Sequence, residues 1–251
     1  MPRTSVACDP AREERELREY LGDEFDLSRL QAYQRTLDEE LASCGDEQRF
    51  YRTSRGYLYN LTVFAMSKTK QPYLETLAGL VPPGGRVLDY GCGIGSDGLL
   101  LLEAGYRVEF ADFSNPSTEY LRWRLRRRGL EAAVHDVDAG VPGGFDAAFA
   151  FDVIEHVEDP FAFLAEVESR ARIVEVNLLE PVEDDQDIHH ELPIEPILRR
   201  AAERGLLRYR LLHGRSHLVA YRTAPGGTRA RLAGRARLLG GRLRARAGAL
   251  R

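Results

Sequence analysis

The segment from Val87 to Gly95 constrains the fold of this chain more than any other part of it. It reads Val-Leu-Asp-Tyr-Gly-Cys-Gly-Ile-Gly, an apolar strand that ends beside an acidic residue and runs into alternating glycines. Glycine has no Cβ atom, so it reaches backbone angles closed to other residues and lets a ligand lie against the main chain. The helical stretch that follows, 97–103, offers unpaired N–H groups at its start. The segment therefore predicts a nucleotide-binding loop at the end of a parallel strand.

Further apolar runs follow this loop, and helical patterns separate most of them. The first ends at Asp112, where a carboxylate can accept hydrogen bonds from both hydroxyls of an unphosphorylated ribose. Strands are expected at 107–112, 132–137, 173–178, 207–213 and 216–222, and the run 145–157 contains another strand with a motif after it. The last two runs are joined at Gly214 and predict a hairpin. Strands that alternate with helices predict an α/β protein with a doubly wound, mostly parallel sheet.

The run Asp89-Tyr90-Gly91-Cys92-Gly93-Ile94-Gly95 resembles the first motif of class I S-adenosylmethionine-dependent methyltransferases, and Glu155-His156-Val157 after a strand resembles a later one. The resemblance covers residues 72–222. It implies a Rossmann-like seven-stranded sheet that ends in an antiparallel hairpin, with an N-terminal helical cap, and S-adenosylmethionine as cofactor. The cofactor-binding positions that it implies are Asp89, Gly91, Gly93, Gly95, Asp112, Phe113, Asp136, Val137 and Asp152.

Two other classes of function remain open at this point. The dinucleotide fingerprint fits Gly93-Ile94-Gly95-Ser96-Asp97-Gly98, but its first glycine then lies two residues beyond the strand-to-turn junction. That match is the basis for an alternative, an NAD(P)-dependent oxidoreductase. A second alternative is a non-catalytic protein that keeps the cofactor loop and binds lipid or polyanion through its arginine-rich end.

Composition sets limits on the compartment and the partners of the chain. Its 251 residues, 43% of them hydrophobic, can bury one substantial core and an accessory segment. There is no apolar run of about eighteen residues, so no membrane-spanning helix is expected. Cys8, Cys44 and Cys92 are odd in number and widely spaced, which favours a reducing cytoplasm. A net charge of −4 argues against a long nucleic acid as substrate.

Three parts of the chain differ in character. Residues 1–71 have helical periodicity and aromatic side chains, and we expect a cap or lid in which Tyr57 and Tyr59 wall the site. Residues 72–222 form the expected methyltransferase core. Residues 223–251 carry eight arginines after Thr228 and no acid. This tail could form a basic amphipathic helix that touches anionic surfaces, but its Gly and Ala residues interrupt the apolar face, so we expect it to be disordered.

Histidines and carboxylates gather in the loops after the fourth and fifth strands. Asp152, Glu155 and His156 have a spacing that one helical turn would bring to one face, and His190 follows the next strand. Small-RNA 2′-O-methyltransferases and ubiquinone-pathway O-methyltransferases have a similar pattern, and the former use it to hold magnesium. The resemblance thus implies a Mg²⁺ site made of these four residues, although Asp152 replaces a glutamate and His189 competes with His190.

Without a metal, His156, His189 or His190 is the natural general base, because an imidazole titrates near neutral pH. The expected reaction is methyl transfer to a hydroxyl or an amine of a small acceptor. A sugar, a phenolic compound, a lipid headgroup and a modified peptide all fit. The high Arg, Ala and Gly content with few lysines is typical of GC-rich bacterial coding and favours specialised metabolism.

Overall fold

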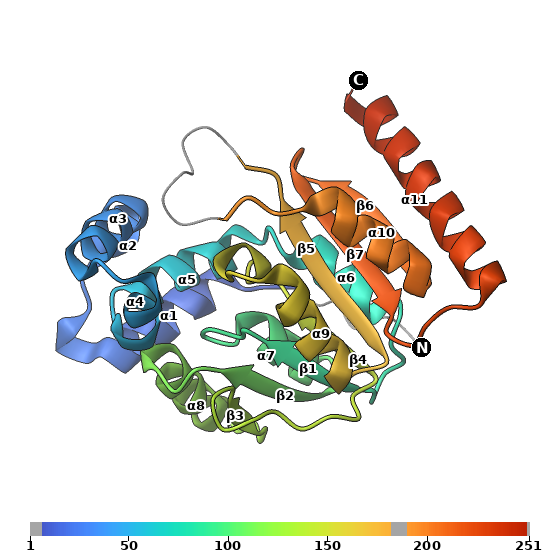
Figure 1. Cartoon of the computed structure of the whole chain (residues 1–251). Helices are drawn as coiled ribbons and strands as arrows, with labels where there is room; N and C mark the ends of the chain where they lie inside the picture. The colour runs from blue at the N-terminus through green and yellow to red at the C-terminus, as the bar shows by residue number, and fades with distance from the viewer. Residues whose placement is uncertain (1–6, 182–189, 250–251) are drawn as a thin grey trace. The chain divides into compact units, whose positions relative to one another are not determined.

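The computed structural model describes residues 7–181 and 190–249. Among these residues, seven strands form a sheet in the order β3-β2-β1-β4-β5-β7-β6 (Figure 1). The strands are β1 (Arg86–Tyr90), β2 (Arg107–Asp112), β3 (Val134–Asp136), β4 (Ala147–Ala150), β5 (Ile173–Leu179), β6 (Leu206–Leu212) and β7 (Ser216–Arg222). β1 pairs with β4, β4 with β5 and β2 with β3, all in parallel, whereas β7 runs antiparallel to both β5 and β6. The expected α/β sheet with a terminal antiparallel hairpin is confirmed.

The described residues divide into two compact units, and the chain crosses between them more than once. The first unit comprises Met1–Glu75 and Gly91–Val141, and the second comprises Thr76–Tyr90 and Pro142–Arg251. The division of the chain into a cap, a core and a tail stays a prediction about domains. No helix in the described part of the chain is long and apolar enough to cross a membrane.

The N-terminal helices expected from the sequence are present in the first unit. They are α1 (Pro10–Leu21), η1 (Gly22–Glu24), α2 (Leu27–Gln31), α3 (Tyr33–Cys44), α4 (Glu47–Thr53), α5 (Tyr57–Ser67) and the start of α6 (Gln71–Ala78). Aspartate side chains at the N-caps accept hydrogen bonds from backbone N–H groups that have no partner within the helix. These residues are Asp9 for α1, Asp26 for α2 and Asp46 for α4. Gly45 ends α3 in the left-handed conformation, as glycine does at many helix ends.

The core of the first unit joins these helices to the glycine loop. Ile94, from the middle of the loop, is buried in one cluster with Leu17 and Leu21 of α1, Leu58 of α5 and Tyr120 of α8 (Pro116–Arg128). A buried isoleucine removes apolar area from water and stabilises the contact by about 1.5–3 kcal/mol. The N-terminal helices are therefore part of the loop's own hydrophobic core.

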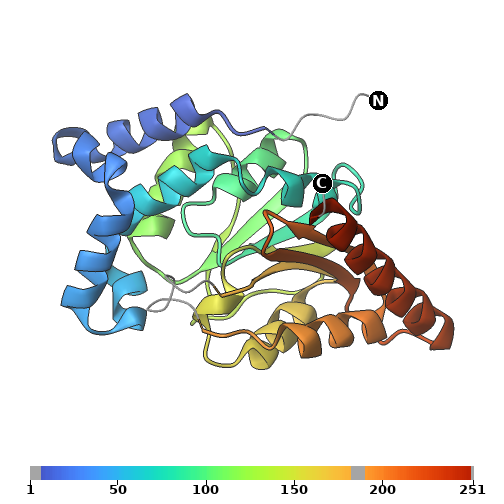
Figure 2. The same cartoon turned by 90° about the horizontal axis from the view of Figure 1, so that it is seen from above.

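The second unit contains the buried centre of the sheet. Every residue of β4 is buried, as expected for a parallel strand with both faces covered. Its helices are the end of α6, η2 (Ile154–His156), α9 (Pro160–Arg170), α10 (Ile194–Arg204) and α11 (Thr228–Ala249). α11 packs against α10 and against the edge strand β6, and Figure 2 shows α10 and α11 approaching each other at an angle.

The disordered tail that we expect after residue 222 is not what the structure contains. Residues 228–249 form α11, which packs against α10 and β6. The glycines that interrupt its apolar face are the points of closest approach. A Cβ on Gly234 would lie 2.4 Å from the carbonyl oxygen of Ala202, and one on Gly241 would lie 2.3 Å from the Tyr209 ring. The glycines thus allow close packing of this helix, and the expectation of disorder is wrong.

Substitution of these glycines tests the packing of α11. Gly234→Ala should lower the free energy of unfolding by about 1–3 kcal/mol, because the added methyl group overpacks the contact with α10. Gly240→Ala is the matched control: its Cβ would meet nothing closer than the Arg244 guanidinium at 3.6 Å. There the helix propensity of alanine should raise stability by up to about 1 kcal/mol. Denaturant unfolding measures both, and a stabilising effect of Gly234→Ala would contradict the packed helix.

Candidate cofactor and acceptor sites

The loop after β1 has the backbone conformation that its glycines predict. Gly91, Gly93 and Gly95 have φ angles of 73°, 51° and 70°, in the left-handed region that favours glycine. A Cβ on Gly95 would lie 2.4 Å from Leu121 Cδ1, and one on Gly93 would lie 3.1 Å from Leu61 Cδ1. Other residues would therefore be strained at these positions and would displace side chains of α5 and α8. The loop leads directly into α7 (Ser96–Glu103), with Gly95 as its N-cap.

Asp112 ends β2 and holds the glycine loop through its carboxylate. The Gly93 N–H donates to Asp112 Oδ2 at 2.7 Å, and the Phe113 N–H donates to Oδ1 at 2.7 Å. Burial raises the pKa of Asp112, and the hydrogen bonds from these two N–H groups act against that increase. Each oxygen keeps a further lone pair, so the carboxylate can accept hydroxyl donors while it holds the loop. This donor and acceptor pattern fits the ribose of S-adenosylmethionine.

The segment after β3 is tied to the same aspartate. The Val137 N–H donates to the backbone carbonyl of Asp112 at 3.1 Å, and the Asp136 side chain accepts the Asp138 N–H at 3.0 Å. The Arg52 guanidinium of α4 lies 3.9 Å from the centre of the Phe113 ring and donates to both oxygens of Asp138. The first unit thus brings the predicted residues 91–95, 112–113 and 136–137 into one connected region, with α4 attached to it.

A buried ion network that the sequence analysis missed fixes α1 to this region. Arg124 of α8 is fully buried and donates to Glu16 Oε2 at 2.8 Å and to Glu13 Oε1 at 2.5 Å. Its Nη1 also donates to the carbonyl oxygen of Ile94 at 2.9 Å and to Ser96 Oγ at 2.8 Å. One guanidinium therefore contacts α1, the glycine loop and the first residue of α7.

Other groups complete the network. Ser96 Oγ donates to Glu13 Oε2 at 2.8 Å, and Arg128 donates to both oxygens of Glu16 at 2.7 and 2.8 Å. Burial opposes ionisation of Glu16, but the hydrogen bond from Arg128 and the charges of Arg124 and Arg128 lower its pKa to about 2. The two arginines and the two glutamates named here balance in charge.

In the second unit, Asp152 is clamped by a strand residue that the sequence analysis did not single out. The Asp152 N–H donates to Asn177 Oδ1 at 2.8 Å, and Asn177 Nδ2 donates to Asp152 Oδ1 at 2.6 Å. Asp152 has a φ of 54°, which is uncommon for a residue with a side chain and costs free energy unless neighbouring contacts hold it. The sequence feature that could have identified Asn177 is that it is the one asparagine in the otherwise mostly apolar run of β5.

The metal site expected at Asp152, Glu155, His156 and His190 is not formed among the described residues. No group of three His, Cys, Asp or Glu side chains in the described part of the chain lies close enough together to hold a metal ion. Glu155 and His156 lie on the short 3₁₀ helix η2, which begins at Ile154, so the α-helical turn that the prediction needs is absent. Glu155 is also buried, with 1% of its surface exposed. The residues present do not fit Mg²⁺.

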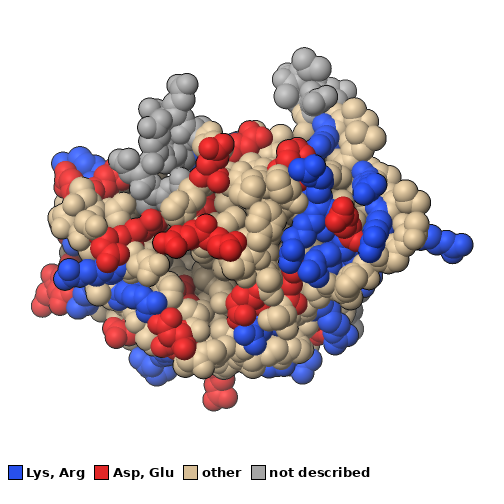
Figure 3. All heavy atoms as spheres, in the orientation of Figure 1, with Lys and Arg blue, Asp and Glu red and all other residues tan. Residues whose placement is uncertain are grey.

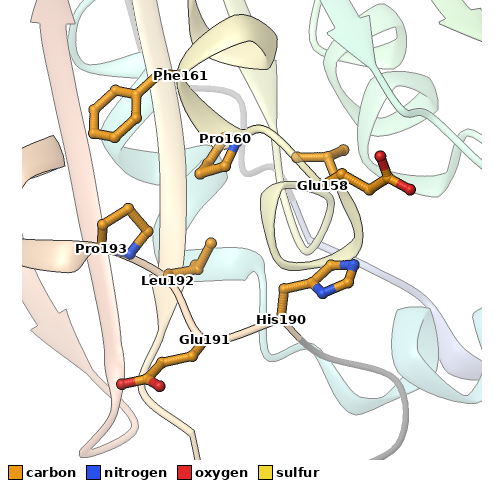
Figure 4. A pocket seen from close by; sticks show the side chains of 8 residues that line it. Glu158, Pro160, Phe161, His190, Glu191, Leu192 and Pro193 are labelled. Atoms are coloured by element: carbon orange, nitrogen blue, oxygen red, sulfur yellow. The ribbon is translucent and has the colours of Figure 1, made fainter.

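His190 instead lines a cavity of about 500 Å³ in the second unit (Figure 4). Its backbone N–H donates to the Glu155 carbonyl at 2.8 Å, which anchors this segment to η2. In Figure 4 the His190 ring and the Glu158 side chain extend toward the same side. The remaining lining is mostly apolar and comes from Val157, Pro160, Phe161, Leu192 and Pro193, with Glu191 as a second acid. His189 lies outside the described residues.

The two tyrosines expected to wall the site differ in environment. Tyr59 is buried in the cluster of α1, α2 and α5; its hydroxyl accepts the Asp26 N–H at 2.9 Å and donates to the Glu24 carbonyl at 3.3 Å. Tyr59 is therefore a structural residue. Tyr57 is half-buried and contacts the rings of Phe50 and Tyr51.

The strand order, the glycine loop and the acid at the end of the next strand together define a class I S-adenosylmethionine-dependent methyltransferase. A family described as "Methyltransferase domain" matches residues 64–202, more than half of the chain. The chain belongs to this family. The oxidoreductase alternative and the non-catalytic alternative are therefore wrong.

Known proteins agree with this assignment. Ubiquinone biosynthesis O-methyltransferase from Xanthomonas campestris pv. campestris is 30% identical over 105 residues, and that from Xanthomonas axonopodis pv. citri is 33% identical. The matched segment covers 40% of this chain and 43% of those relatives, less than half of their length. Among solved structures, magnesium protoporphyrin IX methyltransferase from Synechocystis PCC 6803 with bound SAM has a TM-score of 0.52 at 20% identity and covers 86% of this chain and 98% of its own. An O-methyltransferase family protein from Burkholderia thailandensis has a TM-score of 0.56 at 14% identity, over 79% of this chain and 71% of that one.

Removal of Arg124 should destabilise the protein strongly. Arg124→Gln leaves Glu13 and Glu16 buried with fewer donors, and the free energy of unfolding should fall by about 3–5 kcal/mol. Arg127→Gln on the same helix is the matched control, because the Arg127–Glu19 pair is exposed and contributes little. Denaturant unfolding of the two variants measures the difference. Equal effects would show that the buried network does not anchor α1.

Asp112→Asn should weaken binding of S-adenosylhomocysteine by about 10- to 100-fold, the loss expected for hydrogen bonds to a charged group. Ribose hydroxyls donate better to an ionised carboxylate, so binding should weaken as the pH falls through the pKa of Asp112. Because that pKa is raised, the loss of affinity should begin at a higher pH than for an ordinary aspartate. The affinity of Asp112→Asn should not depend on pH in this way. Calorimetric titration across pH measures both effects. Glu109→Gln, on the same strand, controls for charge removal, and unchanged affinity in Asp112→Asn would contradict the assignment.

Proposed function

We propose that this methyltransferase acts on a hydroxyl or an amine of a small-molecule acceptor. The observation that supports the proposal best is the cavity in the second unit, with apolar walls, one histidine and two acids. Its volume of about 500 Å³ lies in the range of small-molecule sites, about 300–1,000 Å³. The groups that we propose for the acceptor line this cavity in the second unit.

S-adenosylmethionine, when bound, supplies an electrophilic methyl group on a positively charged sulfur. The protein must hold the acceptor atom in line with that methyl group and, for a hydroxyl, take up its proton. His190 is the base that we propose, because it lines the cavity and an imidazole accepts a proton near neutral pH. The proton passes from the acceptor oxygen to a ring nitrogen of His190. His156 and His189 are the alternatives that the same experiment separates.

Oxygen is the acceptor atom that we favour. The relatives named as ubiquinone biosynthesis O-methyltransferases support methyl transfer to oxygen. The Phe161 ring and the Leu192 side chain suit a ring-shaped or otherwise apolar acceptor. An amine is the second candidate, because the carboxylates of Glu158 and Glu191 would attract a cationic acceptor.

The setting that we propose for the enzyme is specialised metabolism in the cytoplasm. The support is the low content of cysteine and the net charge of −4, which disfavours a polyanionic substrate. A methylation assay with labelled cofactor against sugars, phenolic compounds, lipid headgroups and peptides identifies the acceptor class.

With the acceptor found in this assay, His190→Ala should lower kcat by about 10²- to 10⁴-fold, the contribution of a general base. The affinity for S-adenosylhomocysteine should stay unchanged, since His190 belongs to the acceptor side. His156→Ala and His189→Ala are tested in parallel, and the largest loss identifies the base. The control is His213→Asn: this exposed histidine lies in the hairpin turn with a φ of 53°, which asparagine tolerates. Full activity in all three alanine variants would overturn the proposal of a histidine base. An amine would then be the favoured acceptor, because it reacts through its lone pair without such a base.

A further inference from the structure

The outer face of α11 carries a row of exposed leucines. Leu232, Leu239 and Leu243 have 62%, 62% and 58% of their surface exposed. They are spaced by seven and four residues, which places them on one line along a helix. The opposite face of the helix, with Gly234, Leu238 and Gly241, is the face that packs on α10 and β6. The leucine row is thus fixed in a direction away from the protein core.

Arginines lie on both sides of this row. At 3.6 residues per turn, Arg235 and Arg242 fall on one side of the leucines, and Arg229 and Arg244 fall on the other. The helix contains no aspartate or glutamate. Figure 3 shows the basic side chains gathered over α11 and its surroundings. An apolar row between basic rows is the pattern of a helix that lies in the plane of a membrane surface.

A groove beside the leucine row adds a site for an anion. A cavity of about 260 Å³ lies between α10 and α11, and its lining includes Arg199, Arg235 and Arg242 together with Leu238 and Leu239. Glu203 is the acid in the lining, and it lies 3.8 Å from Arg235, a loose and exposed contact. Arg242 contacts Glu195 outside the lining. Guanidinium groups bind phosphate through paired N–H donors, so the groove suits a phosphate group next to an apolar chain.

We propose that α11, with the groove along α10, docks the enzyme on the surface of an anionic phospholipid bilayer. The three leucines enter the boundary between headgroups and acyl chains, Arg229 and Arg244 contact phosphates on one side, and the groove arginines bind a lipid phosphate on the other. A second copy of the chain suits this face less well. A stable protein interface buries about 800 Å² on each partner with few charges at its centre, and a single leucine row between arginines does not supply that.

Vesicle flotation of the full chain tests the docking. Binding to phosphatidylcholine vesicles that contain phosphatidylglycerol should exceed binding to pure phosphatidylcholine vesicles and should weaken with salt. The double variant Leu239→Ser/Leu243→Ser should bind roughly tenfold more weakly, because it loses the inserted apolar area. Each of Arg229→Gln and Arg244→Gln should reduce binding by roughly fivefold, the effect of one basic residue near an anionic surface.

Matched controls separate docking from general effects. Leu27→Ser removes an exposed leucine of α2, and Arg35→Gln removes an exposed arginine of α3; both should leave vesicle binding unchanged. Thermal unfolding confirms that each variant is folded. The affinity for S-adenosylhomocysteine should be the same in all of them, so the test of membrane docking is independent of the methyltransferase site.

Three results would overturn the proposal. One is equal binding to neutral and anionic vesicles, or binding to neither. Another is competition by inorganic phosphate or glycerol phosphate that removes all vesicle binding at an ionic strength where sodium chloride does not, which would assign the groove to a soluble anion. The third is a dimer in sedimentation experiments that Leu239→Ser/Leu243→Ser converts to monomer, which would assign the leucine row to a second copy.

Discussion

The buried guanidinium of Arg124 is the contact on which the arrangement of the first unit depends. It donates in different directions to two carboxylates of α1, to the Ile94 carbonyl in the glycine loop and to the Ser96 hydroxyl. A lysine could not do this, because its ammonium is a single point on a flexible stem, whereas guanidinium is a planar fork. A buried ion network costs desolvation and seldom adds much net stability. Its value here is geometric: it sets where α1 lies against the loop.

The loop is consequently held from several directions. Asp112 accepts the N–H of Gly93, Arg124 donates to the carbonyl of Ile94, and the Ile94 side chain is buried among α1, α5 and α8. A loop whose backbone is already fixed loses less conformational freedom when a ligand binds, and this raises affinity without new contacts. The same carboxylate that holds the loop is the one that can accept the ribose hydroxyls. Loop order and cofactor binding are therefore coupled through Asp112.

The sequence reveals the parts of this site that depend on local chemistry. The sequence predicts the left-handed glycines after an apolar strand and the acid at the end of the next strand, because the role of each residue follows from its immediate neighbours. The contact between Arg124 and Glu13 cannot be predicted in this way, since 111 positions separate the two residues and charged residues on a helix usually face water. The run after β4 was misjudged because a 3₁₀ helix and an α-helix share the same short sequence pattern. In α11, glycine was read as an interruption, whereas the structure uses Gly234 and Gly241 for close approach.

Departures from the usual distribution of polar and apolar residues are the informative features of this protein, because a buried charge or a continuous row of exposed leucines needs a physical reason. Arg124 is buried with its full set of partners, and the result is a fixed loop. Glu175 on β5 is fully buried, and neither of its carboxyl oxygens has a hydrogen-bond partner among the described residues; burial raises its pKa well above the ordinary value, which favours the neutral form. The leucines of α11 are the reverse case, because they are apolar but exposed to solvent. A hydrocarbon side chain has no proton to gain or lose, so it cannot adapt to its surroundings as a carboxyl group does. In the docking that we propose, a partner surface covers these leucines, and the arginines beside them favour a surface of negative charge.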